Sequence, residues 1–199
     1  MRERARRATS AGLDTTVFDA VIEAGDRFAC RQLAVELAAF LADPATPEVE
    51  RQAVVPAVLK LAGFPDEALR RDFAARLAQA PALHADIVFT LAAAEDEIAL
   101  PFLATTPALD AWRMLAIFQV GDTARRVMLA NRRDIHPEVV TAIAGRGCPG
   151  SVAALLDNAA CRPRPSDYRR MYERFVDEPD IVERLLERPD LPPELRILH

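Results

Sequence analysis

The chain has 199 residues, of which 51% are apolar, and this length can bury a core without disulfides or metal ions. Its formal net charge of −5 argues against bulk binding of nucleic acid, and no apolar run reaches the roughly 18 residues of a membrane-spanning helix. Alanine and leucine dominate, and no segment alternates apolar and polar residues as a half-buried strand does. The composition therefore predicts an all-α protein with no membrane insertion.

The N-terminal segment and the cysteines indicate the compartment. The three cysteines are widely spaced and form no C-x-x-C pair. Arg2, Arg4, Arg6 and Arg7 are not followed by the apolar segment of a secretion signal. We therefore expect a cytoplasmic protein with reduced thiols. Residues 1–13 are charged, small and aperiodic, and we expect them to form a mobile arginine-rich arm.

Residues 14–64 have the pattern of irregular helices that precede a more regular part. Apolar stripes follow one another at helical spacing and end at glycine or Asp-Pro. Thr46, Pro47 and Glu48 indicate a helix start, because they suit the N-cap, the first position and the first turn. Pro56 lies inside the helix that follows and should kink or shorten it.

Residues 65–199 are regular, with a period of 26 residues. A leucine recurs at this spacing, and the positions 11 and 14 residues after it are apolar and share one helical face. The recurring leucines are Leu77, Leu103, Leu129 and Leu155, and the apolar pairs are Val88 and Leu91, Met114 and Ile117, and Val140 and Ile143. Each unit is too small to bury its own apolar face, so it must pack against its neighbours. We expect a single α-helical repeat domain over residues 14–199, a HEAT-like α-solenoid of short antiparallel helix pairs with about twelve helices.

The fourth unit is longer than the others, and a fifth is partial. Leu155 and its next equivalent, Leu185, are 30 residues apart, and the extra residues fall in the turn segment 162–165, Arg-Pro-Arg-Pro. The stretch that begins at Leu129 is repeated from Leu185, with an arginine three residues and an aspartate five residues after each leucine.

Several of these stretches resemble an uncharacterised bacterial family of HEAT-like helical proteins, a domain of unknown function. They are residues 97–103 (EIALPFL), 129–132 (LANR), 155–160 (LLDNAA) and 188–192 (RPDLP). The resemblance extends over residues 65–199 and rests on the order and spacing of the motifs. It implies an α-helical repeat fold, and it supplies no established activity and no catalytic residues.

The sequence contains no pattern of a catalytic or metal site. His84, His136 and His199 are far apart, and none stands with a cysteine at the spacing of zinc ligands. The only glycine-rich candidate for a phosphate loop, residues 145–147, lacks the following Lys-Ser/Thr pair. We therefore predict no cofactor, no metal ion and no enzymatic activity.

Some single residues have both a functional and a structural interpretation. Cys148 precedes a predicted helix, where a thiol can have a lowered pKa, but no histidine or acid is visibly paired with it. Cys161 falls on an apolar repeat position and is interpreted as core. Trp112 stands near Asp110, and we expect it to pack in the interior. The acidic residues in 177–180 are interpreted as favourable to a helix start.

The feature that points to a partner is a cluster of arginines around the third and fourth recurring leucines. Equivalent turns of a solenoid line up along one edge, so these arginines would form a positive ridge on a chain that is negative overall. Guanidinium groups suit the recognition of phosphate and carboxylate. The members of the cluster are Arg125, Arg126, Arg132, Arg133, Arg162, Arg164, Arg169 and Arg170. The structural alternative is a solvated surface with internal ion pairs to Asp122, Asp134, Asp157 and Asp167.

Taken together, these patterns predict a non-enzymatic interaction module, a scaffold or regulator, whose partner is another protein that the sequence does not identify. The alternative is a binder of nucleic-acid backbone, or of another polyanion, through the arginine-rich edge. The sequence does not indicate whether the chain forms homo-oligomers.

Overall fold

The computed structural model describes residues 15–197, and this part of the chain forms fourteen helices and no strand. The prediction of an all-α protein is confirmed. The predicted arginine-rich arm, residues 1–13, lies outside the described residues. Contacts divide the chain into two compact units, Met1–Ala108 and Leu109–His199, and each is described by itself. The prediction of a single repeat domain over residues 14–199 stays a prediction.

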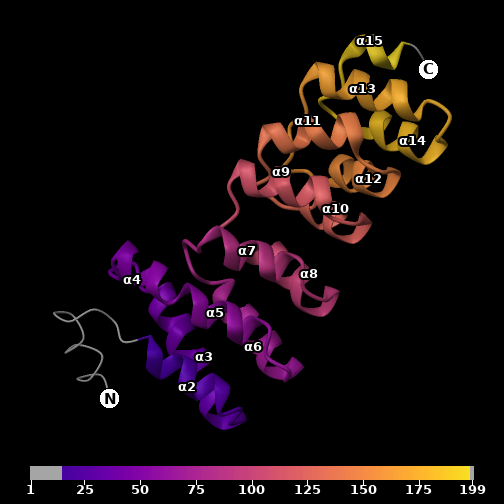
Figure 1. Cartoon of the computed structure of the whole chain (residues 1–199). Coiled ribbons are helices and arrows are strands. Elements are labelled where there is room, and N and C mark those ends of the chain that lie inside the picture. Colours follow the sequence, from indigo (N-terminus) through magenta and orange to yellow (C-terminus); the bar gives the residue numbers. More distant parts are fainter. Residues whose placement is uncertain (1–14, 198–199) are drawn as a thin grey trace. The chain divides into compact units, whose positions relative to one another are not determined.

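The N-terminal unit arranges its helices in two rows. Its described residues form α2 (Thr16–Glu23), α3 (Arg27–Ala42), α4 (Glu48–Ala53), α5 (Val55–Ala62), α6 (Glu67–Leu77), α7 (Ala85–Ala92) and α8 (Asp96–Thr105). Helices α2, α5 and α7 follow one another in one row, and α3, α6 and α8 follow one another in the other (Figure 1). Each helix also contacts its partner across the rows, in the pairs α2 with α3, α5 with α6 and α7 with α8.

Proline shortens a helix in this unit, as predicted. Helix α4 ends at Ala53, and α5 begins at Val55 with Pro56 in its first turn, where a missing N–H costs nothing. The prediction for Thr46 is wrong, because Pro47 occupies the N-cap of α4. The hydroxyl of Thr46 instead donates to the Phe40 carbonyl at 2.8 Å and closes the end of α3.

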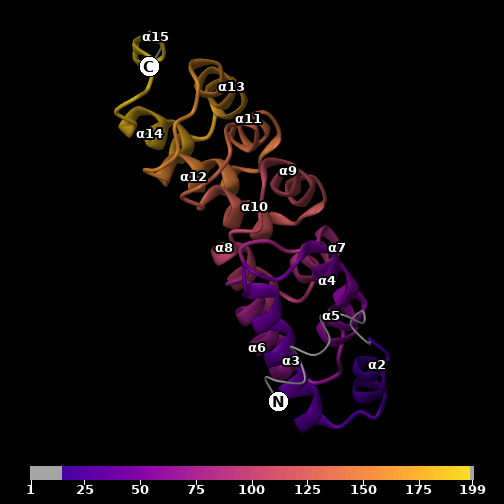
Figure 2. The same ribbon diagram turned by 90° about the vertical axis from the view of Figure 1, so that its left-hand side faces the viewer.

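The C-terminal unit has the same two-row arrangement. It contains α9 (Ala111–Val120), α10 (Thr123–Ala130), α11 (Pro137–Arg146), α12 (Pro149–Asp157), α13 (Pro165–Phe175), α14 (Pro179–Glu187) and α15 (Pro193–Arg196). Helices α9, α11 and α13 form one row, and α10, α12 and α14 form the other (Figure 2). The pairs α9 with α10, α11 with α12 and α13 with α14 join the rows.

The recurring leucines are the centre of the core in each unit. Leu77, Leu103, Leu129, Leu155 and Leu185 are all at most 1% exposed. The apolar pairs that follow them at 11 and 14 residues are buried as well. Burying one leucine side chain stabilises a fold by about 1.5–3 kcal/mol. The recurring leucines therefore supply much of the packing energy for helices that are too short to be stable on their own.

Two glycines end helices of the same row in the C-terminal unit. Gly121 follows α9, Gly147 follows α11, and they stand at equivalent positions of the repeat. The chain turns so tightly there that a Cβ atom would lie 2.6 Å from the Ile117 carbonyl oxygen at Gly121 and 2.5 Å from the Ile143 carbonyl oxygen at Gly147. Glycine is therefore needed for close approach of the backbone, since the backbone angles are ordinary.

Replacing Gly147 by alanine should destabilise the protein by about 1–3 kcal/mol, because a backbone atom blocks the new methyl group. Gly150 offers the matched control. Gly150 lies inside α12, and a Cβ atom there would meet Val127 at 3.6 Å and Thr123 at 3.9 Å, both ordinary contacts, so Gly150→Ala should be neutral or stabilise by up to about 1 kcal/mol. Urea unfolding of both variants measures the difference, and equal stabilities would contradict the close approach.

Candidate anion-binding surface

Arg132, a member of the predicted cluster, is buried and bound by its own turn. Its side chain is held by Asp134, with Nε 2.9 Å from Oδ1 and Nη2 2.8 Å from Oδ2. The residue is only 6% exposed. A two-pronged pair of this kind orients the guanidinium strongly. Arg132 therefore belongs to the interior of the unit and not to an exposed ridge.

Arg188 occupies the equivalent position after Leu185 and is buried to the same degree. Its Nη2 donates to the Cys161 carbonyl at 2.8 Å, and its Nη1 donates to the carbonyls of Leu156 at 3.2 Å and Asn158 at 3.1 Å. Asp190 binds the same guanidinium from the other side, as Asp134 binds Arg132. One side chain thus fastens α14 to the turn between α12 and α13.

Asn158 stands at the same repeat position, three residues after Leu155. Its Nδ2 donates to the carbonyls of Ala130 and Arg132, each at 2.8 Å. These carbonyls belong to the turn of the preceding repeat, which connects α10 to α11. Asn158 and Arg188 are therefore structural polar bridges to the turn of the preceding repeat.

Burial and hydrogen bonding around Arg188 shift several pKa values. Burial raises the pKa of the Cys161 thiol to about 11, and burial also raises the pKa of Tyr168. For Asp190, burial acts to raise the pKa, but hydrogen bonds from Arg188 and Tyr168 outweigh it and hold the pKa below its ordinary value. The buried cluster thus keeps a carboxylate charged and a thiol protonated.

Three further arginines of the predicted cluster are also engaged. Arg125 pairs with Asp122, Nη1 to Oδ2, at 2.7 Å. Arg126 donates from Nε to the Phe118 carbonyl at 3.1 Å, and its guanidinium lies 5.2 Å from the centroid of the Phe118 ring. Arg162 donates to the carbonyls of its own turn. These three side chains satisfy helix ends and turns, which removes them from the set available to a partner.

The remaining four predicted arginines form a different group. Arg133, Arg164, Arg169 and Arg170 are exposed, and their guanidinium groups have no acceptor among the residues that the structure describes. Arg133 precedes α11 and the other three lie on α13 or at its N-cap, so they sit on two helices in contact. Arg146, at the end of α11, is exposed in the same way. Arg146 is not among the predicted residues, because a basic residue in the last turn of a helix has an ordinary capping interpretation. We call these five residues the arginine surface.

The shape of α11 lets one of these side chains lie across it. The Cδ and Nη1 atoms of Arg170 come within 3.6 Å of the position that a Cβ of Gly145 would take. One turn earlier, the hydroxyl of Thr141 is buried without a hydrogen-bond partner among the described residues. The exposed carboxylates on the two helices are Glu138 and Glu173. The arginine surface therefore keeps a net positive charge.

Cys148 is the N-cap residue of α12 and is half-buried. Burial acts to raise its pKa, but hydrogen bonds from Ser151 and Thr123 outweigh this effect and hold the pKa below its ordinary value. Its Sγ lies 3.5 Å from the Ser151 Oγ. Within residues 15–197, no histidine or carboxylate is hydrogen-bonded to the thiol, so the arrangement lacks the base that a nucleophilic cysteine requires.

The histidines act at helix starts in the described part of the chain. The Nδ1 of His84 accepts from the Asp86 N–H at 3.3 Å at the start of α7, and His136 is the N-cap residue of α11. His199 lies outside the described residues. Between residues 15 and 197, no group of three or more histidine, cysteine, aspartate or glutamate side chains could hold a metal ion.

Trp112 differs from its prediction. It is 63% exposed on α9, so the expectation of interior packing is wrong. The core position of this helix belongs to Met114, two residues further on, and residues two apart point to different faces of a helix.

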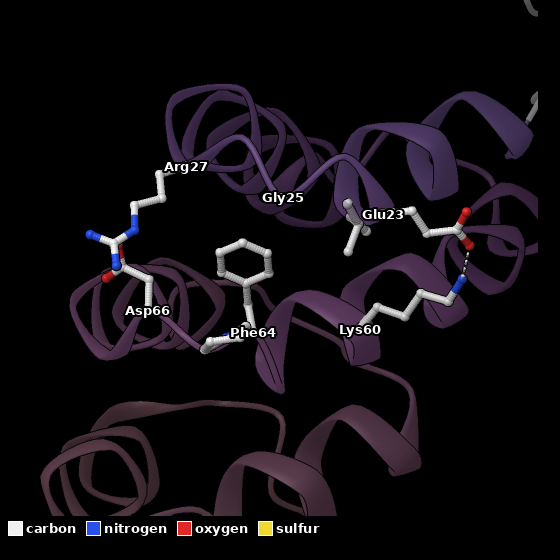
Figure 3. Close-up of a pocket in the computed structure, with 8 residues that line it drawn as sticks. Glu23, Gly25, Arg27, Lys60, Phe64 and Asp66 are labelled. Atoms are coloured by element: carbon white, nitrogen blue, oxygen red, sulfur yellow. Dashed lines mark ion pairs between the residues drawn. The ribbon is translucent and has the colours of Figure 1, made fainter.

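A hollow of about 530 Å³ lies in the N-terminal unit between α2, α5 and the start of α6 (Figure 3). Phe64 is part of its lining, and its charged groups pair with one another. Lys60 lies 3.9 Å from Glu23, and Arg27 lies 3.7 Å from Asp66. The lining contains no histidine, cysteine or serine, and its polar groups do not converge on a common point.

Residues 15–197 thus form an all-α protein, and the uncommitted arginines of the predicted cluster lie on α13, at its N-cap and in the turn before α11. A family described as an uncharacterised protein conserved in bacteria (DUF2336) matches residues 98–198, just over half of the chain. The chain belongs to this family, which confirms the prediction of an uncharacterised bacterial family. Searches of curated proteins and of solved structures found no match. None of the described helices is long and apolar enough to cross a membrane.

The neighbours Arg132 and Arg133 should respond very differently to substitution by methionine. Arg132→Met removes a buried guanidinium and its hydrogen bonds, so the free energy of unfolding should fall by about 1–3 kcal/mol. Arg133→Met should change it by less than about 0.5 kcal/mol, because the side chain is exposed. Chemical denaturation of the two variants provides the comparison. Equal effects would mean that the two positions are not structurally distinct.

The lowered pKa of Asp190 predicts a pH-dependent contribution to stability. A carboxylate with a folded pKa below its unfolded value, about 3.9, stabilises the fold above that pH, and the contribution is lost as pH falls through the folded pKa. The wild-type protein should therefore exceed Asp190→Asn in unfolding free energy at pH 7, and the gap should narrow below about pH 4. A gap that stays constant from neutral to acid pH would exclude the ionised carboxylate as its cause.

Proposed function

We propose that the chain is a non-enzymatic interaction module whose arginine surface binds an acidic segment of a protein partner. One observation carries the proposal. The other arginines of the predicted cluster are bound by carbonyls or carboxylates, whereas the five on α11, on α13 and in the turns before them are exposed and uncommitted.

The charge of this surface favours a carboxylate-rich partner. The guanidinium group of arginine has a planar set of donors that matches the two oxygens of a carboxylate. Guanidinium groups without acceptors inside the protein can therefore bind the carboxylates of a partner. The chain as a whole has a net charge of −5, so the surface is a local positive region on a negative protein. Such a region speeds the encounter with an acidic partner and discriminates against basic ones.

We further propose that the helix pairs stack as a HEAT-like α-solenoid with a repeat of about 26 residues. Three features support this architecture: the two-row order of helices in each unit, the buried leucine register, and the polar bridges from Asn158 and Arg188 to the preceding turns. Stacked helix pairs present extended surfaces, which suits a scaffold or regulator in the bacterial cytoplasm. This placement follows from the class of protein and not from any single residue.

A nucleic-acid backbone is the alternative partner, and the observations favour it less. Glu138 and Glu173 are exposed on the same two helices, so the arginines do not form an unbroken run of cations. Binding to a nucleic-acid backbone gains most of its affinity from the counterions that the nucleic acid releases. This release requires a dense run of cations on the protein. The arginine surface does not supply such a run.

The proposal predicts binding of a model acidic segment, a fluorescent poly-Glu peptide of about twelve residues. Reversing two charges in Arg169→Glu/Arg170→Glu should weaken binding at least about tenfold, or ~1.4 kcal/mol, because attraction becomes repulsion. The control Arg71→Glu/Arg76→Glu makes the same charge change at two exposed arginines of α6, of which Arg71 pairs with Glu67, and should bind as the wild type does. Fluorescence anisotropy at low salt measures all three proteins.

Two outcomes would contradict the proposal. An equal loss in the α6 control would show that only net charge matters. Tighter binding of a short DNA duplex than of poly-Glu, with a steep dependence on salt, would favour the nucleic-acid alternative.

A further inference from the structure

Ser166 is an exposed hydroxyl residue on the helix that carries most of the arginine surface. It lies in the first turn of α13, directly after Pro165. The other serine among the described residues, Ser151, is fully buried. The Ser166 hydroxyl has no hydrogen-bond partner in the described part of the chain. It is therefore open to solvent and not used by the fold.

Two members of the arginine surface follow Ser166 on the same helical face. Arg169 and Arg170 stand three and four residues after it. Residues at these spacings are neighbours on a helix, with Cβ atoms about 5–6 Å apart. Both arginines are exposed, and neither guanidinium has an acceptor among the described residues. A charged group attached to Ser166 would thus lie within reach of two uncommitted cations.

The position of Ser166 in the helix favours a negative charge. The first turn of α13 is the positive end of its dipole, and an anion that precedes a cation by four residues makes the better ion pair. Glu173 follows Arg169 in the opposite order, and the structure shows no ion pair between them. The buried Asp167 accepts the N–H of Arg164 at 3.0 Å. Its repulsion of a second anion is the cost that the two arginines must offset.

We propose that Ser166 is a phosphorylation site, and that its phosphate binds Arg169 and Arg170 and so blocks the acidic segment from the arginine surface. This inference rests on the proposed function, since it names the regulation of the same surface. Phosphoserine carries about −1.5 to −2 charges at pH 7 and forms about 1–3 charge-assisted hydrogen bonds when it faces arginines. Because the phosphate is tethered, its effective concentration is in the millimolar range, and a free acidic segment must compete with it.

The modification requires a protein serine kinase and a nucleoside triphosphate. The Ser166 oxygen forms a bond to the γ-phosphorus, and the bond from that phosphorus to the oxygen that bridges it to the β-phosphorus breaks. The nucleoside diphosphate leaves, and the hydroxyl proton passes to a carboxylate of the kinase. The chain itself supplies only the acceptor hydroxyl and the arginines that bind the product.

Fluorescence anisotropy with the poly-Glu peptide tests the block, on the full chain with phosphoserine inserted at position 166 during translation. Binding should be at least about tenfold weaker than that of the unmodified chain. A control chain carries phosphoserine at position 105 in place of Thr105, which is exposed at the end of α8 and has no arginine within four residues in the sequence. It should bind as the unmodified chain does. Equal losses in both chains, or no loss with the phosphate at 166, would overturn the inference and leave the proposed function standing.

Phosphorus nuclear magnetic resonance tests the contact without poly-Glu. The second pKa of phosphoserine is ordinarily about 6, and two nearby guanidinium groups should lower it because they favour the dianion. The pKa should return toward its ordinary value in Arg169→Gln/Arg170→Gln, and circular dichroism checks that this variant folds. A phosphate with the same pKa in both chains would overturn the contact. If the pKa responded but the unmodified chain did not bind poly-Glu, the proposed function would fail and the phosphate contact would stand.

Mass spectrometry of the chain purified from the bacterium that produces it tests the modification itself. The inference predicts a phosphate on the peptide that contains Ser166, and its loss in Ser166→Ala. A Ser166 that stays unmodified in growing and in starved cells would overturn the assignment as a phosphorylation site.

Discussion

The structure depends on how short helices satisfy the backbone groups at their ends. The helices of the C-terminal unit from α9 to α14 have only 8 to 11 residues, and each end leaves about four N–H or carbonyl groups without a partner inside the helix. Polar side chains supply those partners. Arg174, for example, donates to the carbonyls of Ala144 at 2.7 Å and Gly147 at 2.6 Å at the end of α11. Without such bonds, the tight turns that bring successive helices together would leave buried carbonyls unsatisfied.

This constraint explains why the arginines divide into two groups. Arg188 and Arg132 lie at the position where a side chain reaches inward toward a turn, so the fold uses them. Arg169 and Arg170 are exposed on α13 and have no acceptor among the described residues, so their charge is left for a partner. A basic residue in this protein therefore has a structural or a binding role according to its place in the repeat.

The repeat register was predictable from the sequence, and the roles of the individual arginines were not. Leu129 and Leu155 are buried where the period of 26 residues places them, because apolar spacing reports directly on helical faces. Arg132 and Arg133 are the same residue type, and only the path of the turn determines which side chain points inward. Trp112 shows the same limit, because a large apolar residue on a short helix is buried only if its side chain points toward a neighbouring helix.

The division of arginines is tested most directly by the guanidinium Nε–H signals in a nuclear magnetic resonance experiment. We expect slow exchange with water for Arg132 and Arg188, whose Nε atoms donate to acceptors within the protein. We expect fast exchange for Arg169 and Arg170, and when poly-Glu is added we expect shifts for the signals of the arginine surface and none for Arg132 and Arg188. Fast exchange at Arg188, or a poly-Glu shift at Arg132 in place of Arg169 and Arg170, would contradict this division of the arginines.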